Sequence, residues 1–169
     1  MKLLFLSICL LPISLLHAQL LENPGFEQEL KGWQIKEKSP MSSAAESAAR
    51  EGKAGLHIAD ESSDSGASLS SERFAANPGQ KVTLTFWARA TKDKLAAVMI
   101  MPYGTDRKAI PNEEGKAPVV IAINESGDWE RYEAELVLPA ETATFAVSIH
   151  SWPGAMGSAD LDDFELKLE

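Results

Sequence analysis

The chain has 169 residues and a formal net charge of −9 at pH 7, with 25 acidic residues against 16 basic ones. This length is enough for one domain with a two-layer core. An acidic chain is poorly suited to nucleic acid or to an anionic lipid surface, because both would repel it. Neutral ligands and cations remain as partners, and so does a plain solvated surface.

The first eighteen residues have the pattern of a secretory signal peptide. Lys2 provides a positive start, residues 3–16 are largely apolar, and the segment ends on the small residue Ala18. The apolar run is shorter than the roughly 18 residues needed to cross a bilayer. We expect cleavage after Ala18, without membrane insertion, and a secreted or periplasmic protein that starts at Gln19. A buried N-terminal strand or helix is the alternative.

The only cysteine, Cys9, lies inside this apolar run. A mature chain that starts at Gln19 would have no thiol, no disulfide and no zinc site built from cysteines. It would also lose Lys2, so 15 basic residues would stand against 25 acidic ones, a net charge of −10. We expect such a domain to depend on its hydrophobic core, with a bound metal as a possible aid.

Alternating apolar residues dominate the chain after residue 54. In residues 82–90, for example, Val82, Leu84 and Phe86 alternate with more polar side chains. A period of two indicates half-buried strands, and frequent turn signals between them favour an antiparallel sandwich over parallel βαβ units. We expect strands near residues 19–22, 33–37, 54–60, 67–74, 81–90, 95–103, 118–124, 129–138, 143–151 and 159–168. The alanine-rich segment 39–51 is interpreted as a loop leading into an edge strand, with a short helix as the alternative.

Five segments resemble, in the same order, the carbohydrate-binding modules of the family 4/9 and family 22 type. These are "LLENPGFEQELKGWQI" (20–35), "REGKAGLHI" (50–58), "NPGQKVTLTFWARA" (77–90), "GDWERYEAELVLP" (127–139) and "ADLDDFELKLE" (159–169). The resemblance implies an all-β fold, namely an antiparallel β-sandwich of the galactose-binding-like jelly-roll type. We expect it to form a single domain over residues 19–169.

The resemblance also implies a function, a non-catalytic module that binds a polysaccharide or an oligosaccharide, and we expect it to be a monomer. Two alternatives remain: a structural or adhesive cell-envelope module with the same fold, and an accessory module of a glycoside hydrolase. The sequence contains no Gly-x-Ser-x-Gly turn and no His-Glu-x-x-His helix. The adjacent acids Glu113-Glu114 and Asp162-Asp163 would point to opposite faces of a strand, so neither pair forms an acid–base couple.

The expected ligand surface is the polar side of the strands at 82–90 and 144–152. An indole presents a flat apolar face to a sugar ring, while arginine and histidine donate hydrogen bonds to hydroxyl groups. Trp33 and Trp129, at strand starts, are expected in the core. Trp87 could instead be covered by a loop. The candidate ligand-binding residues are Trp87, Arg89, Tyr103, His150 and Trp152.

A structural calcium ion is expected where the opening turn meets the closing strand. Calcium prefers six to eight oxygen ligands, both carboxylates and backbone carbonyls. Asp162 shares its strand face with Phe164, so it should point inward. Ordinary turn residues are the alternative. The ligand set implied by the resemblance consists of the side chains of Glu27, Glu51 and one aspartate and the carbonyls of Gly25 and Lys53, and the inward direction expected for Asp162 makes it the choice over Asp163.

Overall fold

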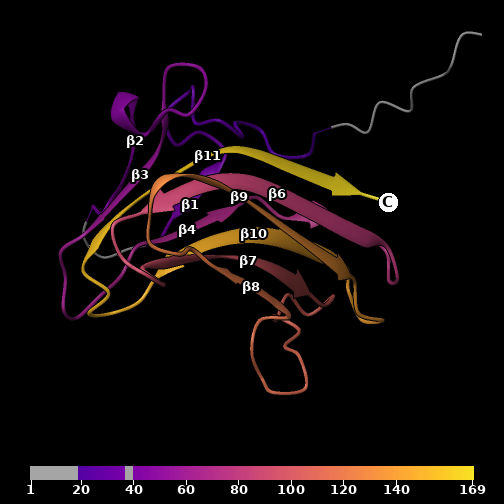
Figure 1. Ribbon diagram of the computed structural model, residues 1–169. Helices are drawn as coiled ribbons and strands as arrows, with labels where there is room; N and C mark the ends of the chain where they lie inside the picture. Colours follow the sequence, from indigo (N-terminus) through magenta and orange to yellow (C-terminus); the bar gives the residue numbers. More distant parts are fainter. Residues whose placement is uncertain (1–18, 37–39) are drawn as a thin grey trace, which may run out of the picture.

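The computed structural model describes residues 19–36 and 40–169, so the predicted signal peptide lies outside the described residues. Within them the chain forms two antiparallel sheets that pack face to face (Figure 1). The elements are β1 (Trp33–Ile35), β2 (Ser42–Ala45), the 3-10 helix η1 (Glu46–Ala48), β3 (Gly55–Asp60), β4 (Ser68–Ser71), β5 (Phe74–Ala75), β6 (Lys81–Ala90), β7 (Ala96–Tyr103), β8 (Val119–Ala122), β9 (Ser126–Val137), β10 (Thr144–Ser151) and β11 (Gly157–Leu168).

One sheet has six strands in the order β1-β4-β10-β7-β8, with β5 paired to β10. The other has five strands in the order β2-β3-β11-β6-β9. Neighbours in space are mostly distant in sequence, as the jelly-roll topology requires. The predicted fold class, an all-β antiparallel sandwich of the galactose-binding-like jelly-roll type, is confirmed. No helix of the described residues is long and apolar enough to span a bilayer.

An aromatic cluster joins the two sheets at the start of the chain. Phe164 of β11 lies with its ring centre 6.0 Å from Phe26, 5.7 Å from Trp33 and 5.0 Å from Phe86. All four side chains are at most 7% exposed. Burying such rings stabilises a domain strongly, so this cluster fixes the opening turn against the closing strand. The prediction that Trp33 is a core residue is confirmed.

Three expected elements differ from the structure. The strand expected at 67–74 is divided into β4 and β5, which both pair with β10. Residues 19–22 form no strand: the side-chain amide of Gln19 donates to the carbonyl of Phe164 at 2.7 Å and its oxygen accepts from the N–H of Leu166 at 3.0 Å, beside one long backbone bond of 3.4 Å from the N–H of Leu20 to the carbonyl of Leu166. The alanine-rich segment forms the edge strand β2, paired with β3, followed by the single turn of η1. Small side chains such as alanine are compatible with a helix and with an edge strand. Residues 42–45 form a strand because they pair with β3.

Candidate functional site

The predicted ligand-binding residues do not lie on one surface. β6 belongs to the five-stranded sheet and β10 to the six-stranded sheet, so the outward side chains of the two strands point away from each other. The expectation of a shared ligand surface on these strands is therefore wrong. Trp87 and Arg89 lie on the outer surface of the five-stranded sheet, which we call the five-stranded face. Tyr103, His150 and Trp152 belong to the outer surface of the other sheet, the six-stranded face.

An exposed indole marks one end of the six-stranded face. Trp152 directly follows β10, is 41% exposed, and contacts the imidazole of His150 edge-on, with 5.3 Å between the ring centres. The ladder partners of His150 are Ser68 on β4 and Ala97 on β7, and both are small. The small neighbours leave the indole accessible, while the imidazole contact restricts its orientation.

Small and polar side chains occupy the middle of this face. Ser148 of β10 lies between Ser70 of β4 and Met99 of β7, and its hydroxyl contacts that of Ser70 at 3.4 Å. The row continues to Val120 of β8, which is 49% exposed. The middle therefore offers the half-buried hydroxyl of Ser148 and apolar contact, whereas the aromatic rings described on this face, those of Tyr103, His150 and Trp152, stand toward its ends.

Tyr103 lies toward the other end of the six-stranded face. It pairs with Thr144, six positions before His150 on β10, which is a separation of about 20 Å at about 3.3 Å per strand residue. The guanidinium of Arg73 covers its ring, with the central carbon 3.6 Å from the ring centre. Beside them is a pocket of about 280 Å³ lined by Gln34, Lys36, Ser70, Ser71, Arg73, Tyr103 and Arg107.

On the five-stranded face the tryptophan is already covered. Trp87 is half-buried, and the guanidinium of Arg50 lies 3.9 Å from the centre of its ring. The carboxylate of Asp163 holds Arg50 in this position at 2.6 Å. A cation over an indole face is an attractive contact, so a sugar that stacked on that side would first have to displace Arg50.

Arg89 is likewise engaged within the protein. It donates to Asp160 at 2.9 Å and to the carbonyl of Ser47 at 2.9 Å, while the other oxygen of Asp160 lies 2.7 Å from Nδ1 of His57. Its guanidinium also lies 4.8 Å from the ring centre of Trp129. These bonds use two of the five guanidinium N–H donors, and the ion pair with Asp160 fixes the side chain within the protein.

The expectation that Trp129 is a core residue is wrong. Its neighbour Arg131, two residues further along β9, pairs with Trp87, whose side chain points outward. A period of two places Trp129 on the same side, where it is half-buried and lies outside the central hydrophobic cluster.

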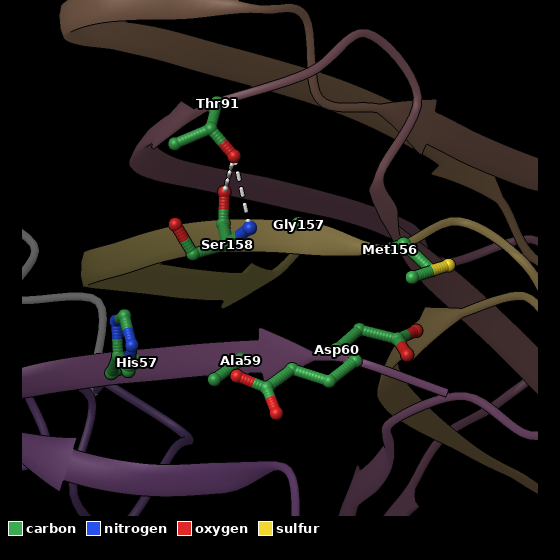
Figure 2. A pocket seen from close by; sticks show the side chains of 8 residues that line it. His57, Ala59, Asp60, Thr91, Met156, Gly157 and Ser158 are labelled. Carbon is green, nitrogen blue, oxygen red and sulfur yellow. Dashed lines mark hydrogen bonds between the residues drawn. The ribbon is translucent and has the colours of Figure 1, made fainter. Parts of the chain in front are cut away.

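A hollow of about 730 Å³ lies on the five-stranded face between the ends of β3 and β11 (Figure 2). Its polar groups largely pair with each other: Thr91 accepts from the N–H of Ser158 at 2.9 Å, and the buried Asp60 accepts from Ser151 at 2.6 Å. Among the described residues that line it, the imidazole of His57 is the only aromatic ring. This hollow is therefore poorly equipped to stack a sugar.

The segments predicted to hold calcium do come together. The carboxylate of Asp162 is completely buried and accepts the N–H groups of Arg50 at 2.8 Å, Glu51 at 3.3 Å and Asp163 at 2.8 Å. Burial raises the pKa of Asp162. Asp162 is buried, but the expectation that it shares the inward face of Phe164 is wrong: it pairs with Trp87, whose side chain points outward, and a shift in register between Asp162 and Glu165 separates it from Phe164. A Cβ on Gly25 would lie 3.4 Å from Oδ1 of Asp162, so the opening turn runs directly past this carboxylate.

The second predicted carboxylate closes the neighbouring turn. Glu27 accepts the N–H groups of Lys53 at 2.8 Å and Ala54 at 3.2 Å, and these bonds lower the pKa of Glu27. The carboxylate of Glu51, however, points to Arg50 at 2.8 Å rather than toward Asp162. Among residues 19–36 and 40–169 no three His, Cys, Asp or Glu side chains are grouped as a metal site. Backbone N–H donors satisfy the carboxylates here, and calcium stays a prediction.

Comparison with known proteins identifies the family. The family model CBM_4_9, described as a carbohydrate binding domain, matches residues 18–156, and the chain belongs to this family. No curated protein matches the chain.

Solved structures share the fold at low sequence identity. "Family 16 Carbohydrate Binding Module-2" aligns with a TM-score of 0.65 and 16% identity, over 87% of this chain and 98% of its own. TmCBM61, solved in complex with β-1,4-galactotriose, gives 0.62 and 21% over 90% and 99%. A structure titled "CBM4 structure and function" gives 0.61 and 15% over 88% and 99%. At such identities the likeness concerns the fold.

Proposed function

We propose that the protein is an exported, non-catalytic carbohydrate-binding module that holds a polysaccharide or oligosaccharide on its six-stranded face. The observation that carries the proposal is the indole of Trp152, 41% exposed on that face and oriented by His150. An indole held in one orientation loses little conformational entropy when a sugar ring stacks on it.

The surroundings of Trp152 support this assignment. Ser148 lies on the same face and is half-buried, so its hydroxyl can take part in hydrogen bonds with sugar hydroxyls. The other outward tryptophans of the described chain, Trp87 and Trp129, lie on the five-stranded face beside arginines. The six-stranded face thus has the accessible aromatic ring together with hydrogen-bonding groups.

The carboxylates support a binding role rather than a catalytic one. Asp162 and Asp163 hold backbone N–H groups and Arg50, so they serve the structure where a glycosidase would need them free in a cleft. Glu113 and Glu114 are exposed in the long loop between β7 and β8, which Figure 1 shows projecting beyond the sheet. These features favour the binding module over an enzyme.

Affinity electrophoresis of wild type, Trp152→Ala and Trp87→Ala against β-glucans, xylans, mannans and galactans tests the proposal. Removal of one stacking indole should cost on the order of 2 kcal/mol, which is roughly thirtyfold in affinity. We expect Trp152→Ala to lose retardation on the polysaccharide that retards the wild type, and Trp87→Ala to keep it.

The remaining outcomes distinguish the alternatives. Loss of retardation in Trp87→Ala but not in Trp152→Ala would move the site to the five-stranded face. If no polysaccharide retards the wild type, the structural or adhesive cell-envelope module becomes the better interpretation.

A further inference from the structure

We propose that the six-stranded face binds an acidic saccharide, whose carboxylate or sulfate group enters the pocket at the Tyr103 end. We call this the basic pocket, and its cations are Lys36, Arg73 and Arg107. The inference rests on the proposed function, since it names the class of sugar that the same face would take.

The distribution of ion pairs singles out this pocket. The described chain has five arginines, and the three outside the pocket, Arg50, Arg89 and Arg131, each pair with a carboxylate. Within residues 19–36 and 40–169, Arg73, Arg107 and Lys36 have no carboxylate within ion-pair distance. In a chain with 25 acidic residues, three cations around one pocket without a carboxylate partner among the described residues are a notable local excess of positive charge.

One cation of the pocket is held in place. The guanidinium of Arg73 lies over the ring of Tyr103, and its Nη1 donates to the backbone carbonyl of Arg107 at 3.3 Å. The backbone of Arg107 lies in a tight turn, in which its N–H donates to the carbonyl of Gly104 at 2.9 Å. The rest of the Arg73 guanidinium edge is available, and a guanidinium presents paired donors that match a carboxylate or a sulfate.

Neutral hydrogen-bonding groups complete the pocket. Gln34 lines it beside the cations, is exposed, and can bond the hydroxyls of the sugar ring that carries the anionic group. The carboxylates that adjoin these cations in the described sequence are Glu72 and Asp106, which are exposed and do not line the pocket, and Asp106 pairs with Lys108. The pocket therefore accommodates an anion better than a cation.

The net charge of the chain does not exclude an anionic ligand. Charges on the protein surface are screened over about 8 Å at physiological ionic strength, whereas a bound anion touches the pocket cations directly. The ligand has room to continue along the face, since Ser70, Ser148 and Met99 form its middle between the basic pocket and Trp152. A saccharide chain could thus stack at one end and place its anionic group at the other.

Chemically paired polysaccharides test the charge requirement without changing the backbone. The probes are polygalacturonate against its methyl-esterified form, and a sulfated galactan against its desulfated form. Affinity electrophoresis would compare wild type with Arg73→Gln and Arg107→Gln. Arg131→Gln is the matched control, because it removes the same charge from the five-stranded face.

We expect one acidic polymer of a pair to retard the wild type more strongly than its neutral form, and the effect to weaken as salt increases. Each pocket substitution should weaken binding about tenfold, the change expected when a charge-assisted hydrogen bond is lost, while Arg131→Gln binds as wild type. The pair that responds distinguishes a carboxylate from a sulfate.

Other outcomes overturn the inference in recognisable ways. Equal retardation by acidic and neutral forms, or unchanged binding by both pocket variants, refutes the basic pocket but leaves carbohydrate binding intact. A wild type that no polymer retards, charged or neutral, refutes the proposed function and this inference together. Melting temperatures of the variants show that each one is folded.

Discussion

Replacement of Asp162 by alanine should destabilise the protein although it removes a buried charge. The carboxylate accepts two short bonds of 2.8 Å, from the N–H groups of Arg50 and Asp163, and a longer one of 3.3 Å from Glu51. Without it these donors lose their partner, and the turn before β3 is no longer tied to β11.

The size of the effect follows from the bonds. Hydrogen bonds to an ionised acceptor contribute about 1.5–3 kcal/mol each, so the two short bonds amount to roughly 3–6 kcal/mol. Burial of the charge opposes this, as the raised pKa of Asp162 indicates, and the substitution removes that cost too. We expect a net loss of about 3 kcal/mol in the free energy of unfolding, or a melting temperature about 6–12 °C lower.

Urea unfolding in the presence of a chelator measures this loss without any contribution from metal. Glu165→Ala is the matched control: it lies on the same strand, is exposed, and pairs only with Lys167 at 2.8 Å, so it should cost less than about 1 kcal/mol. Asp162→Asn, which keeps one acceptor oxygen, should fall between the two. If Asp162→Ala costs no more than Glu165→Ala, the carboxylate does not hold these segments together.

Two further predictions concern calcium and export. If calcium binds beside Glu27 and Asp162, the melting temperature of the wild type should be higher in millimolar calcium than in excess chelator. The corresponding gain in the free energy of unfolding is about 2.7 kcal/mol at a hundredfold excess over Kd, and Asp162→Ala should show no difference between the two conditions. The same melting temperature of the wild type in both conditions would contradict the site. N-terminal sequencing of the exported protein should give Gln19 as the first residue, and an intact Met1 would contradict cleavage after Ala18.

Most of the strands could be predicted because apolar and more polar residues alternate along them in step with buried and partly exposed positions. In β6, Val82, Leu84 and Phe86 are completely buried while the residues between them are half-buried, so the period of two alone identifies the strand. Residues 19–22 were wrongly predicted to form a strand because their apolar character was taken as the signal. Leu20 and Leu21 are apolar, but the short bonds to β11 come from the side chain of Gln19, and apolar character carries no information on which group makes a hydrogen bond.

The candidate site was harder to predict, because the alternation within a strand does not show to which sheet the strand belongs. The patterns of β6 and β10 correctly placed Trp87 and His150 on outer surfaces. Only the strand order shows that these surfaces are opposite. The basic pocket could not be predicted from the sequence, because Lys36, Arg73 and Arg107 are far apart along the chain. They are brought together by the positions of β1, β4 and the loop after β7.

The groups that lie beside the aromatic rings differ between the two faces, and this difference favours the six-stranded face as the binding surface. Arg50 over Trp87 is anchored by Asp163, and Arg89 beside Trp129 is anchored by Asp160, so both arginines already have a carboxylate partner. Arg73 over Tyr103 has no such carboxylate among the described residues, and the indole of Trp152 has a neighbouring imidazole in place of a covering cation. A ligand that approached Trp87 or Trp129 would have to break the ion pairs of Arg50 or Arg89. An anionic ligand on the six-stranded face would instead give Arg73 a partner.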